Sequence, residues 1–404
     1  MAFPNLSTDE NVLVDPKLLF IGSEIAEGSH ATVYKGRQHI PAVDSGKKTL
    51  CAKHGSLLLE MRFGVQIVAI KVYNFGEELE EKALLESHFV REVTMMSKVK
   101  HENVLEFIGA CKDPLMVIVT EFIPRMTLWK YLIDKRPEKL DLHIALSFSL
   151  DIARAMDCLH ANGIIHADLK PDNLLLTADE KSVKLADFGR VREESFIDLK
   201  TVETGTYRWM APELYNTVAL RQGEKKYYNN KVDIYSFGMV LWALLTNRMP
   251  FEGMSNLQAA YAVVVKPCPC GSEVQSFYPV AKDLLPIQRC FNIYHLMLDL
   301  VGCARVYIKW QKRPSLPDDI SPDLVFIIQS CWVDDPDMRP SFSLIIQMLN
   351  AILSPPPAPS LPEPISSEAP ATNTSTITKF SATAGGKFAF LPRLFAAKNA
   401  RSSQ

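Results

Sequence analysis

The chain has 404 residues, of which 47% are hydrophobic and 22% charged, and this globular composition excludes a wholly disordered chain. The 44 Lys and Arg nearly balance the 46 Asp and Glu and give a net charge of -2, so we expect no nucleic-acid partner that is recognised through a global positive field. The 8 Cys are scattered, and a chain of this length needs no disulfides, so reduced thiols are predicted.

No segment has the pattern of an export signal or a membrane span. The first ten residues lack a basic stretch followed by an apolar core. A membrane helix needs about 18 uncharged apolar residues, and the nearest candidate, 291–308, is interrupted by His295, Asp299 and Arg305. We therefore expect a cytoplasmic protein, with the nucleus and the membrane surface as alternative locations.

The first part of the sequence is predicted to form strands and the rest mainly helices. Strands are predicted where β-branched and apolar residues dominate, near 18–21, 31–34, 68–72 and 115–119. A helix is predicted at 78–99, and a buried helix at 142–160, where apolar residues cover most of the circumference. This order predicts an α+β fold with a mostly-β lobe, a mostly-α lobe and a ligand-binding cleft between them.

Three segments interrupt the globular pattern. The tail, 353–404, opens with a proline-rich stretch and is predicted to be disordered, because it cannot bury enough apolar surface to offset its ordering entropy. Two stretches, about 39–66 and about 267–311, lack clean periodicity and are interpreted as inserted loops, either recent insertions or read-through of normally removed coding segments. A metal site is a weaker alternative for the second, from Cys268, Cys270, Cys290 and Cys303, because these cysteines are not paired at close spacing.

Five short motifs follow one another in a fixed order, and a chance occurrence of all five is improbable. They are Val68-Ala69-Ile70-Lys71, Glu92 in the first long helix, His166-Ala167-Asp168-Leu169-Lys170-Pro171-Asp172-Asn173, Asp187-Phe188-Gly189 and Ala211-Pro212-Glu213. Together they match the signature set of protein kinases. The pattern therefore predicts transfer of a phosphoryl group from ATP.

The residue types suit that chemistry, which needs positioning and the neutralisation of phosphate charge. Lys71 ends a strand and can reach the phosphates, with Glu92 as its fixed anion. Asn173 and Asp187 offer hard oxygen ligands for phosphate-bound Mg²⁺. ATP and Mg²⁺ are the expected cofactors.

Two further residues are candidates for the transfer itself. Asp168 is predicted to accept and orient the proton of the substrate hydroxyl. Lys170 lies two residues later on the same side of an extended loop and can neutralise the transferred group. A solvated surface position is the alternative for each, but Ile164-Ile165 and Leu174-Leu175-Leu176 flank this loop with buried-type sequence.

Residues of about 18–265 and 313–352 resemble a protein kinase of the tyrosine-kinase-like group, and are most similar to plant Raf-like mitogen-activated-protein kinase kinase kinases. The supporting stretches are His101-Glu102-Asn103-Val104, Ile108-Gly109-Ala110-Cys111, Gly205 to Glu213, Val232 to Gly238, Cys331-Trp332 and Arg339-Pro340-Ser341-Phe342. The resemblance implies a bilobal kinase fold with an N-terminal extension at 1–17, an N-lobe at 18–120, a hinge at 121–124, a C-lobe at 125–352 and the tail at 353–404.

The resemblance also implies roles for single residues. The nucleotide-binding set is Ile25, Gly28, Val33, Ala69, Lys71, Thr120 as gatekeeper, Glu121 and Ile123 in the hinge, and Leu175 below the adenine. Asp233 would hold the backbone of the catalytic loop, and Glu213 would pair with Arg339. A regulatory spine would contain Met96, Phe107, His166 and Phe188, each of which is also acceptable as an ordinary core residue.

The substrate class follows from the same loop. Lys170 in Leu169-Lys170-Pro171 is similar to the Ser/Thr kinase pattern, and Thr206 would bond Asp168 and Lys170. The stretch 207–210 is more similar to tyrosine kinases, which makes dual specificity the alternative. Protein substrates are therefore the expected partners.

The sequence departs from the family at three places. Ala26 and Ala31 stand where the phosphate loop usually has glycine, which predicts weakened ATP affinity. Ala167 replaces the arginine that normally binds a phosphate on the activation loop. Phosphorylation at Ser195, Thr201 or Thr204 therefore cannot act through a bond to that arginine. Arg190 brings a charge to a normally apolar turn.

Three functions remain open. An active Ser/Thr kinase is preferred because the charged set is complete, and a pseudokinase scaffold is the alternative because of the three alanines. The third is an adaptor whose basic, aromatic segment 387–401 contacts an anionic membrane or a partner.

Overall fold

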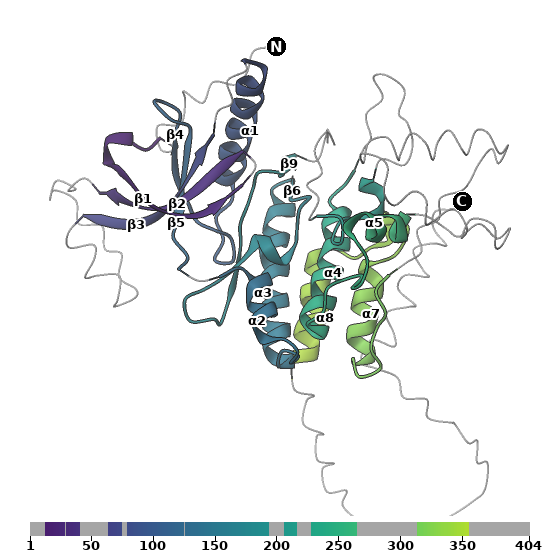
Figure 1. The fold of residues 1–404 in the computed structure, drawn as a ribbon. Coiled ribbons are helices and arrows are strands. Elements are labelled where there is room, and N and C mark those ends of the chain that lie inside the picture. The colour runs from purple at the N-terminus through teal and green to yellow at the C-terminus, as the bar shows by residue number, and fades with distance from the viewer. Residues whose placement is uncertain are drawn as a thin grey trace, which may run out of the picture.

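A computed structural model describes residues 13–28, 30–40, 64–74, 79–124, 126–193, 206–215, 228–264 and 313–354. The chain forms two lobes of different composition (Figure 1). The first lobe is a sheet with one helix, and the second is built mainly from helices, as the sequence predicts. The predicted tail from residue 355 on, the central part of the first predicted insertion, the whole of the second and the phosphorylatable residues 195, 201 and 204 lie outside the described residues. The first residue of the predicted tail, Leu353, instead ends a helix.

The first lobe is a five-stranded antiparallel sheet in the order β1-β2-β3-β5-β4. Its strands are β1 Leu19–Glu27, β2 Ala31–His39, β3 Val65–Tyr73, β4 Phe107–Cys111 and β5 Val117–Glu121. Along β3, Val68 and Ile70 point into a small core with Val117 and Val119, and the intervening residues face the other side. This alternation fixes the register, since a slip of one residue would exchange the two faces.

Two predicted boundaries differ from the structure. The strand predicted at 115–119 runs from Val117 to Glu121 instead, because Asp113 to Leu115 form a bend and Leu115 is exposed. The hairpin of β2 and β3 extends slightly into the predicted insertion, since the Ile40 amide donates to the Gly64 carbonyl at 2.6 Å. Before β1, the Val14 amide donates to the Ala110 carbonyl at 2.9 Å and thereby attaches residues 13–14 to β4.

The helix α1 Leu79–Lys98 packs beside the sheet and matches the predicted helix to within a residue at each end. Its buried residues recur at helical spacing, at Leu85, Phe89, Val93 and Met96. The same face carries Glu92, a carboxylate that is only 2% exposed. A charge at such a position needs a partner from the sheet.

The second lobe is a set of packed helices. They are α2 Leu128–Lys135, α3 Leu142–Ala161, α4 Lys231–Thr246, α5 Asn256–Val264, α7 Pro322–Cys331 and α8 Phe342–Leu353. Short strands lie between α3 and α4: β6 Ile164–Ile165, β7 Leu174–Leu176, β8 Val183–Leu185 and β9 Arg192–Glu193. None of the helices within the described ranges combines the length and apolar content needed to cross a membrane.

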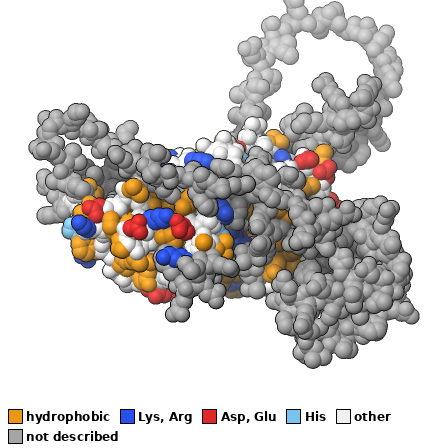
Figure 2. Space-filling view, turned by 90° about the horizontal axis from the view of Figure 1, so that it is seen from above, with side chains coloured by type: hydrophobic (Ala, Val, Ile, Leu, Met, Phe, Trp, Pro, Cys, Tyr) orange, Lys and Arg blue, Asp and Glu red, His pale blue; other side chains and the backbone are white. Residues whose placement is uncertain are grey.

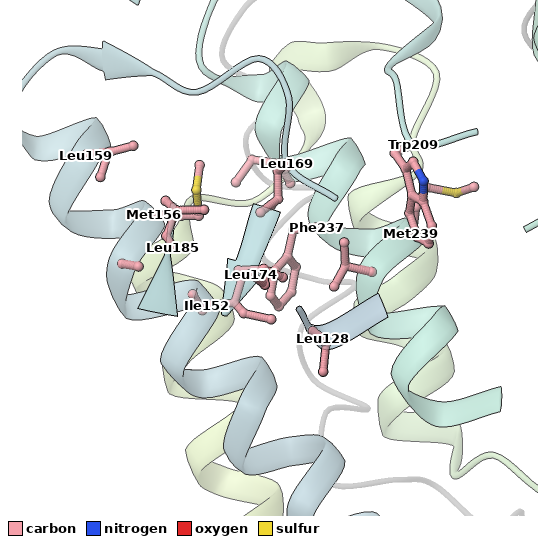
Figure 3. Packing of buried hydrophobic residues seen from close by; sticks show 14 of the residues in the cluster. Leu128, Ile152, Met156, Leu159, Leu169, Leu174, Leu185, Trp209, Phe237 and Met239 are labelled. Atoms are coloured by element: carbon pink, nitrogen blue, oxygen red, sulfur yellow. The ribbon is translucent and has the colours of Figure 1, made fainter. Parts of the chain in front are cut away.

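The core of the second lobe lies directly beneath the loop that carries Asp168. Figure 3 shows Leu174 of β7 and Phe237 of α4 in the space between the helices, with Leu169 of the loop above them. These side chains are at most 1% exposed. The loop therefore rests on closely packed apolar residues, which limit its movement.

The surface of the described residues carries mixed charge. On the face shown in Figure 2, Lys and Arg side chains lie next to Asp and Glu side chains. This distribution agrees with the near-neutral net charge of the chain.

Candidate active site

Lys71 of β3 and Glu92 of α1 form a close ion pair. The Lys71 Nζ lies 2.7 Å from Oε1 and 2.9 Å from Oε2 of Glu92. The Nζ also lies 3.6 Å from Oδ1 of Asp187, the residue two positions after the end of β8. Burial alone would lower the pKa of Lys71, but the two carboxylates outweigh it and raise the pKa. The structure thus brings together three of the predicted charges from three separate elements.

Asp187 is held in position by its backbone as well as by Lys71. Its φ is 59°, in the left-handed region, and its Oδ1 accepts a bond from the Gly189 amide at 3.2 Å. Burial would raise the pKa of this carboxyl, but Lys71 and the Gly189 amide lower it below its usual value. Asp187 is therefore ionised near neutral pH, as a metal ligand must be.

Asp233 of α4 fixes the backbone of the loop between β6 and β7. Its Oδ2 accepts from the His166 amide at 2.9 Å, and its Oδ1 accepts from the Ala167 amide at 2.8 Å. Ala167 has a φ of 61°, a conformation that is unfavourable for a residue with a Cβ atom. The role predicted for Asp233 is thereby confirmed in its geometry.

Asp168 is 3% exposed and is surrounded by polar partners. Its Oδ1 accepts from the Thr206 hydroxyl at 2.9 Å, and its Oδ2 lies 3.0 Å from the Lys170 Nζ. The Asn173 amide also donates to Oδ2, at 3.1 Å. The Lys170 Nζ donates to the Thr206 hydroxyl at 3.2 Å, as predicted for this triad.

Arg190 adds a contact that the sequence did not predict. Its Nη1 lies 3.6 Å from Oδ1 of Asp168, so the charge expected at an apolar turn reaches the predicted catalytic carboxylate. Sequence could indicate the charge but not its partner, because 22 residues of chain separate the two positions.

The two predicted metal ligands lie on one hairpin. Asn173 precedes β7, Asp187 follows β8, and the Ala186 amide donates to the Asn173 carbonyl at 2.8 Å. An amide oxygen and an ionised carboxylate from adjacent strand ends suit a hard cation that is already bound to phosphates. These residues could hold a divalent cation.

The predicted nucleotide-binding residues lie on both lobes. In the sheet register Val33 pairs with Lys71 and Ala69 pairs with Thr120, so these four side chains share one face. Leu175 belongs to β7 in the other lobe, where it forms a β-bridge with Thr127.

The other members of that set lie in or just after β1 and at the end of β5. Ile25 is in β1 with 49% exposure, and Gly28 follows β1. Glu121 ends β5, and Ile123 lies two residues later. The Glu121 side chain accepts from the Glu106 amide at 2.8 Å and from the Lys184 Nζ at 2.6 Å, which ties the predicted hinge to β8.

The phosphate loop departs less from the family pattern than the sequence suggests. Ala26 and Ala31 lie in β1 and β2, and neither has a positive φ. Gly28 also lacks one, and its amide bonds the Ala31 carbonyl at 2.9 Å. The two alanines therefore cause no backbone strain, and only their added Cβ atoms remain as an obstacle to close approach of phosphates.

The remaining predicted pairs are present. The Arg339 guanidinium donates to Glu213 at 2.5 and 3.0 Å, which confirms that ion pair. In the predicted spine, the His166 and Phe188 rings contact edge to face with centroids 6.0 Å apart. Met96 is in the same core cluster and Phe107 packs against it.

Comparison with known proteins decides the family. The family described as "Protein kinase domain" matches residues 59–350. This chain belongs to the protein kinase family. The match begins after β1 and β2, the strands that carry the two alanines of the phosphate loop.

The relatives of this kinase include plant enzymes. It is 34% identical to serine/threonine/tyrosine-protein kinase HT1 of Arabidopsis thaliana over 84% of this chain and 68% of that protein. It is 36% identical to serine/threonine-protein kinase STY46 of the same plant over 84% of this chain and 45% of that protein. For serine/threonine-protein kinase CTR1, also from Arabidopsis thaliana, the identity is 31% over 70% of this chain and 30% of that protein.

These matches confirm the predicted resemblance to plant kinases of the tyrosine-kinase-like group and imply the use of ATP. The kinase spans less than half the length of two of these relatives.

Proposed function

We propose that this kinase transfers the γ-phosphoryl group of ATP to Ser or Thr hydroxyls of protein substrates. The observation that carries this proposal is the assembled charge set, in which the Lys71 Nζ contacts both Glu92 and Asp187. A protein that signals only by binding has no need to bury Glu92 at 2% exposure against a lysine.

Different residues of the chain have different roles in the proposed phosphoryl transfer. When bound, Mg·ATP supplies the phosphoryl group, and Lys71, Asn173 and Asp187 are placed to hold its phosphates and metal. Asp168 orients the substrate hydroxyl and takes its proton as the new O–P bond forms, while the bond from the γ-phosphorus to the bridging oxygen breaks and ADP leaves. Lys170 neutralises charge at the point of transfer, and its bond to Thr206 fixes its direction.

The Ser/Thr preference rests on Lys170 and Thr206, which share the Asp168 carboxylate. The names of HT1 and STY46 are those of kinases acting on serine and threonine, and in HT1 on tyrosine as well. We infer Ser/Thr as the main acceptors and Tyr as a secondary one. Phosphoamino-acid analysis of a labelled substrate would reveal phosphoserine and phosphothreonine in excess over phosphotyrosine.

A transfer assay tests the proposal directly. Purified kinase, radiolabelled ATP with Mg²⁺ and a generic protein substrate should give labelled substrate, and Asp187→Ala should reduce the label to background. Asp179→Ala is the matched control, because Asp179 is an exposed carboxylate in the turn of the same hairpin and bonds only its local neighbours Thr177 and Lys181 among the described residues. If neither the wild type nor Asp187→Ala labels the substrate although both are folded, the result would favour the scaffold.

The scaffold is a second candidate because one observation favours it. Arg190 lies 3.6 Å from the carboxylate that must receive the substrate hydroxyl, and Ala167 removes the usual arginine of this loop. A kinase in which that contact persists would bind nucleotide and transfer phosphate slowly. Nucleotide binding without measurable transfer is the expected result for this candidate.

Location remains a proposal from the sequence. We propose the cytoplasm, with the nucleus or the membrane surface as alternatives, and membrane contact through 387–401, which lies outside the described residues. A fluorescent fusion of the full chain should be diffuse, and deletion of 387–404 should change its distribution only if that segment binds a membrane.

A further inference from the structure

Tyr73 ends strand β3, two residues after Lys71, and therefore projects from the same face of the sheet. It is 4% exposed. Its hydroxyl donates a hydrogen bond to Oε2 of Glu92, the oxygen that also receives a bond from the Lys71 Nζ. The buried Glu92 carboxylate thus has two polar partners on one strand.

The Tyr73 ring makes two further contacts. It packs edge to face against Phe89 of α1, with ring centroids 5.5 Å apart and planes at 87°. The Lys71 Nζ lies 5.6 Å from the ring centroid. Phe89 and Glu92 are one helical turn apart on the same face of α1, so Tyr73 attaches that turn to the sheet through both its ring and its hydroxyl.

The two partners of Glu92 are not equivalent. The side chain of Lys71 is 24% exposed and has a second anion, Asp187, within 3.6 Å, so the ammonium can be shared or redirected. The Tyr73 hydroxyl is buried and has Glu92 as its acceptor. Burial and the neighbouring Glu92 raise the pKa of Tyr73, so the phenol remains a hydrogen-bond donor near neutral pH.

We propose that Tyr73 is a positioning residue that holds helix α1 inward, so that Glu92 stays paired with Lys71 before nucleotide binds. This proposal rests on the proposed nucleotide site and adds a part that the five motifs do not contain. In a protein with two positions of α1, nucleotide affinity falls in proportion to the fraction of molecules in the competent position. Tyr73 keeps the fraction of molecules with α1 in the competent position high, and it does so without a phosphate on the activation loop.

Tyr73→Phe tests the proposal, because it keeps the ring against Phe89 and removes only the hydroxyl. Loss of a hydrogen bond to a buried charged group should raise amide hydrogen exchange of residues 79–98 roughly tenfold. The Kd for Mg·ATP should weaken by less, about twofold, because it rises only as the competent fraction falls from its high starting value. At saturating ATP, kcat should change by less than about twofold, since bound phosphates draw Lys71 and α1 back into place.

Tyr235→Phe is the matched control. Tyr235 of α4 is fully buried, and its hydroxyl has no hydrogen-bond partner among the described residues. Its removal should leave the exchange of α1 and the Kd unchanged. In a Glu92→Gln background, Tyr73→Phe should raise α1 exchange by a smaller factor than in the wild type, because the neutral amide oxygen accepts a weaker hydrogen bond from the hydroxyl than the carboxylate does.

The outcomes are separable. Unchanged exchange of α1 in Tyr73→Phe overturns the proposal, and so does an equal rise of exchange across all helices, which would make Tyr73 merely a structural residue. If the wild type binds no Mg·ATP, the proposed function fails, and hydrogen exchange alone then decides whether Tyr73 holds α1.

Discussion

The carboxylate of Asp168 has a crowded environment. Lys170 and Asn173 contact its Oδ2, and Thr206 and Arg190 contact its Oδ1. In the proposed reaction, a substrate hydroxyl would therefore have to compete for a place on a carboxylate that is only 3% exposed. Arg190 makes the longest of these contacts, at 3.6 Å, so it is the partner most easily displaced.

Replacing Arg190 tests this competition. Arg190→Leu should raise kcat by about two- to fivefold, because it removes a partly exposed ion pair from the carboxylate that is proposed to accept the substrate proton. Arg190→Lys keeps the charge and should give the smaller change. Steady-state kinetics with a peptide substrate measure the effect, and a fall of kcat in Arg190→Leu would show that the guanidinium assists transfer instead.

Among the elements, helix α4 connects the catalytic loop to the core of the second lobe. Asp233 in its first turn accepts from two loop amides and contacts His160 at 2.9 Å. Farther along, Gly238 faces α7, where an added Cβ would meet the Cys331 Cβ at 2.7 Å and the Trp332 Nε1 at 2.8 Å. The helix can approach α7 this closely only because this position has no side chain.

Gly238→Ala should therefore destabilise the kinase. Helix propensity favours alanine by roughly 0.5–1 kcal/mol, whereas overpacking a close-packed interface costs about 1–3 kcal/mol. The second effect is larger, so the free energy of unfolding should fall, as measured by urea denaturation. A gain in stability would mean that α7 shifts at little cost.

At the scale of the whole molecule, one ion pair ties the segment before α4 to the segment before α8. The Arg339 side chain is fully buried, and besides Glu213 it bonds the Val333 carbonyl at 3.0 Å and the Lys231 carbonyl at 2.9 Å. Its guanidinium also lies 5.3 Å from the Tyr235 ring centroid. Several elements of the second lobe thus share one cation.

Removing one partner should be costly. Glu213→Ala leaves a buried cation unpaired and should lower the free energy of unfolding by about 3–5 kcal/mol. Lys139→Ala is the comparison, since its pair with Asp319 lies on the surface and should leave the urea midpoint unchanged. Equal midpoints for Glu213→Ala and the wild type would show that the Arg339 charge is satisfied by the carbonyls alone.

The same core predicts a loss of stability in alkali. Burial raises the pKa of the Cys331 thiol to about 12, although Arg339 and Lys231 lower it. Because the pKa is raised in the folded state, the contribution of the neutral, buried thiol to the free energy of unfolding is intact below about pH 8.5, the usual thiol pKa. It declines as the pH rises toward the pKa of the folded state. Urea denaturation from about pH 7 to about pH 10 should show this decline, and Cys331→Ala should reduce its slope. Identical slopes would contradict the prediction.

Much of the site could be predicted because each motif is local. The lysine at the end of a strand, the acidic residue in the next helix and the loops around Asp168 and Asp187 can each be identified within a few residues. The α+β order of the lobes followed from periodicity, which depends on neighbours along the chain. The strand at Val117–Glu121 was misplaced by two residues because a bend, and not hydrophobicity, sets its start.

The family, the order of the elements and the set of charges can be derived from the amino-acid sequence alone. The contact of Arg190 with Asp168 and the bond of Tyr73 to Glu92 are evident only in the folded protein. The first contact depends on how two loops of the second lobe meet, and the second depends on the register of β3 in the sheet and on how α1 packs beside it. Neither is encoded within one short stretch of residues, because both result from burying many side chains at once.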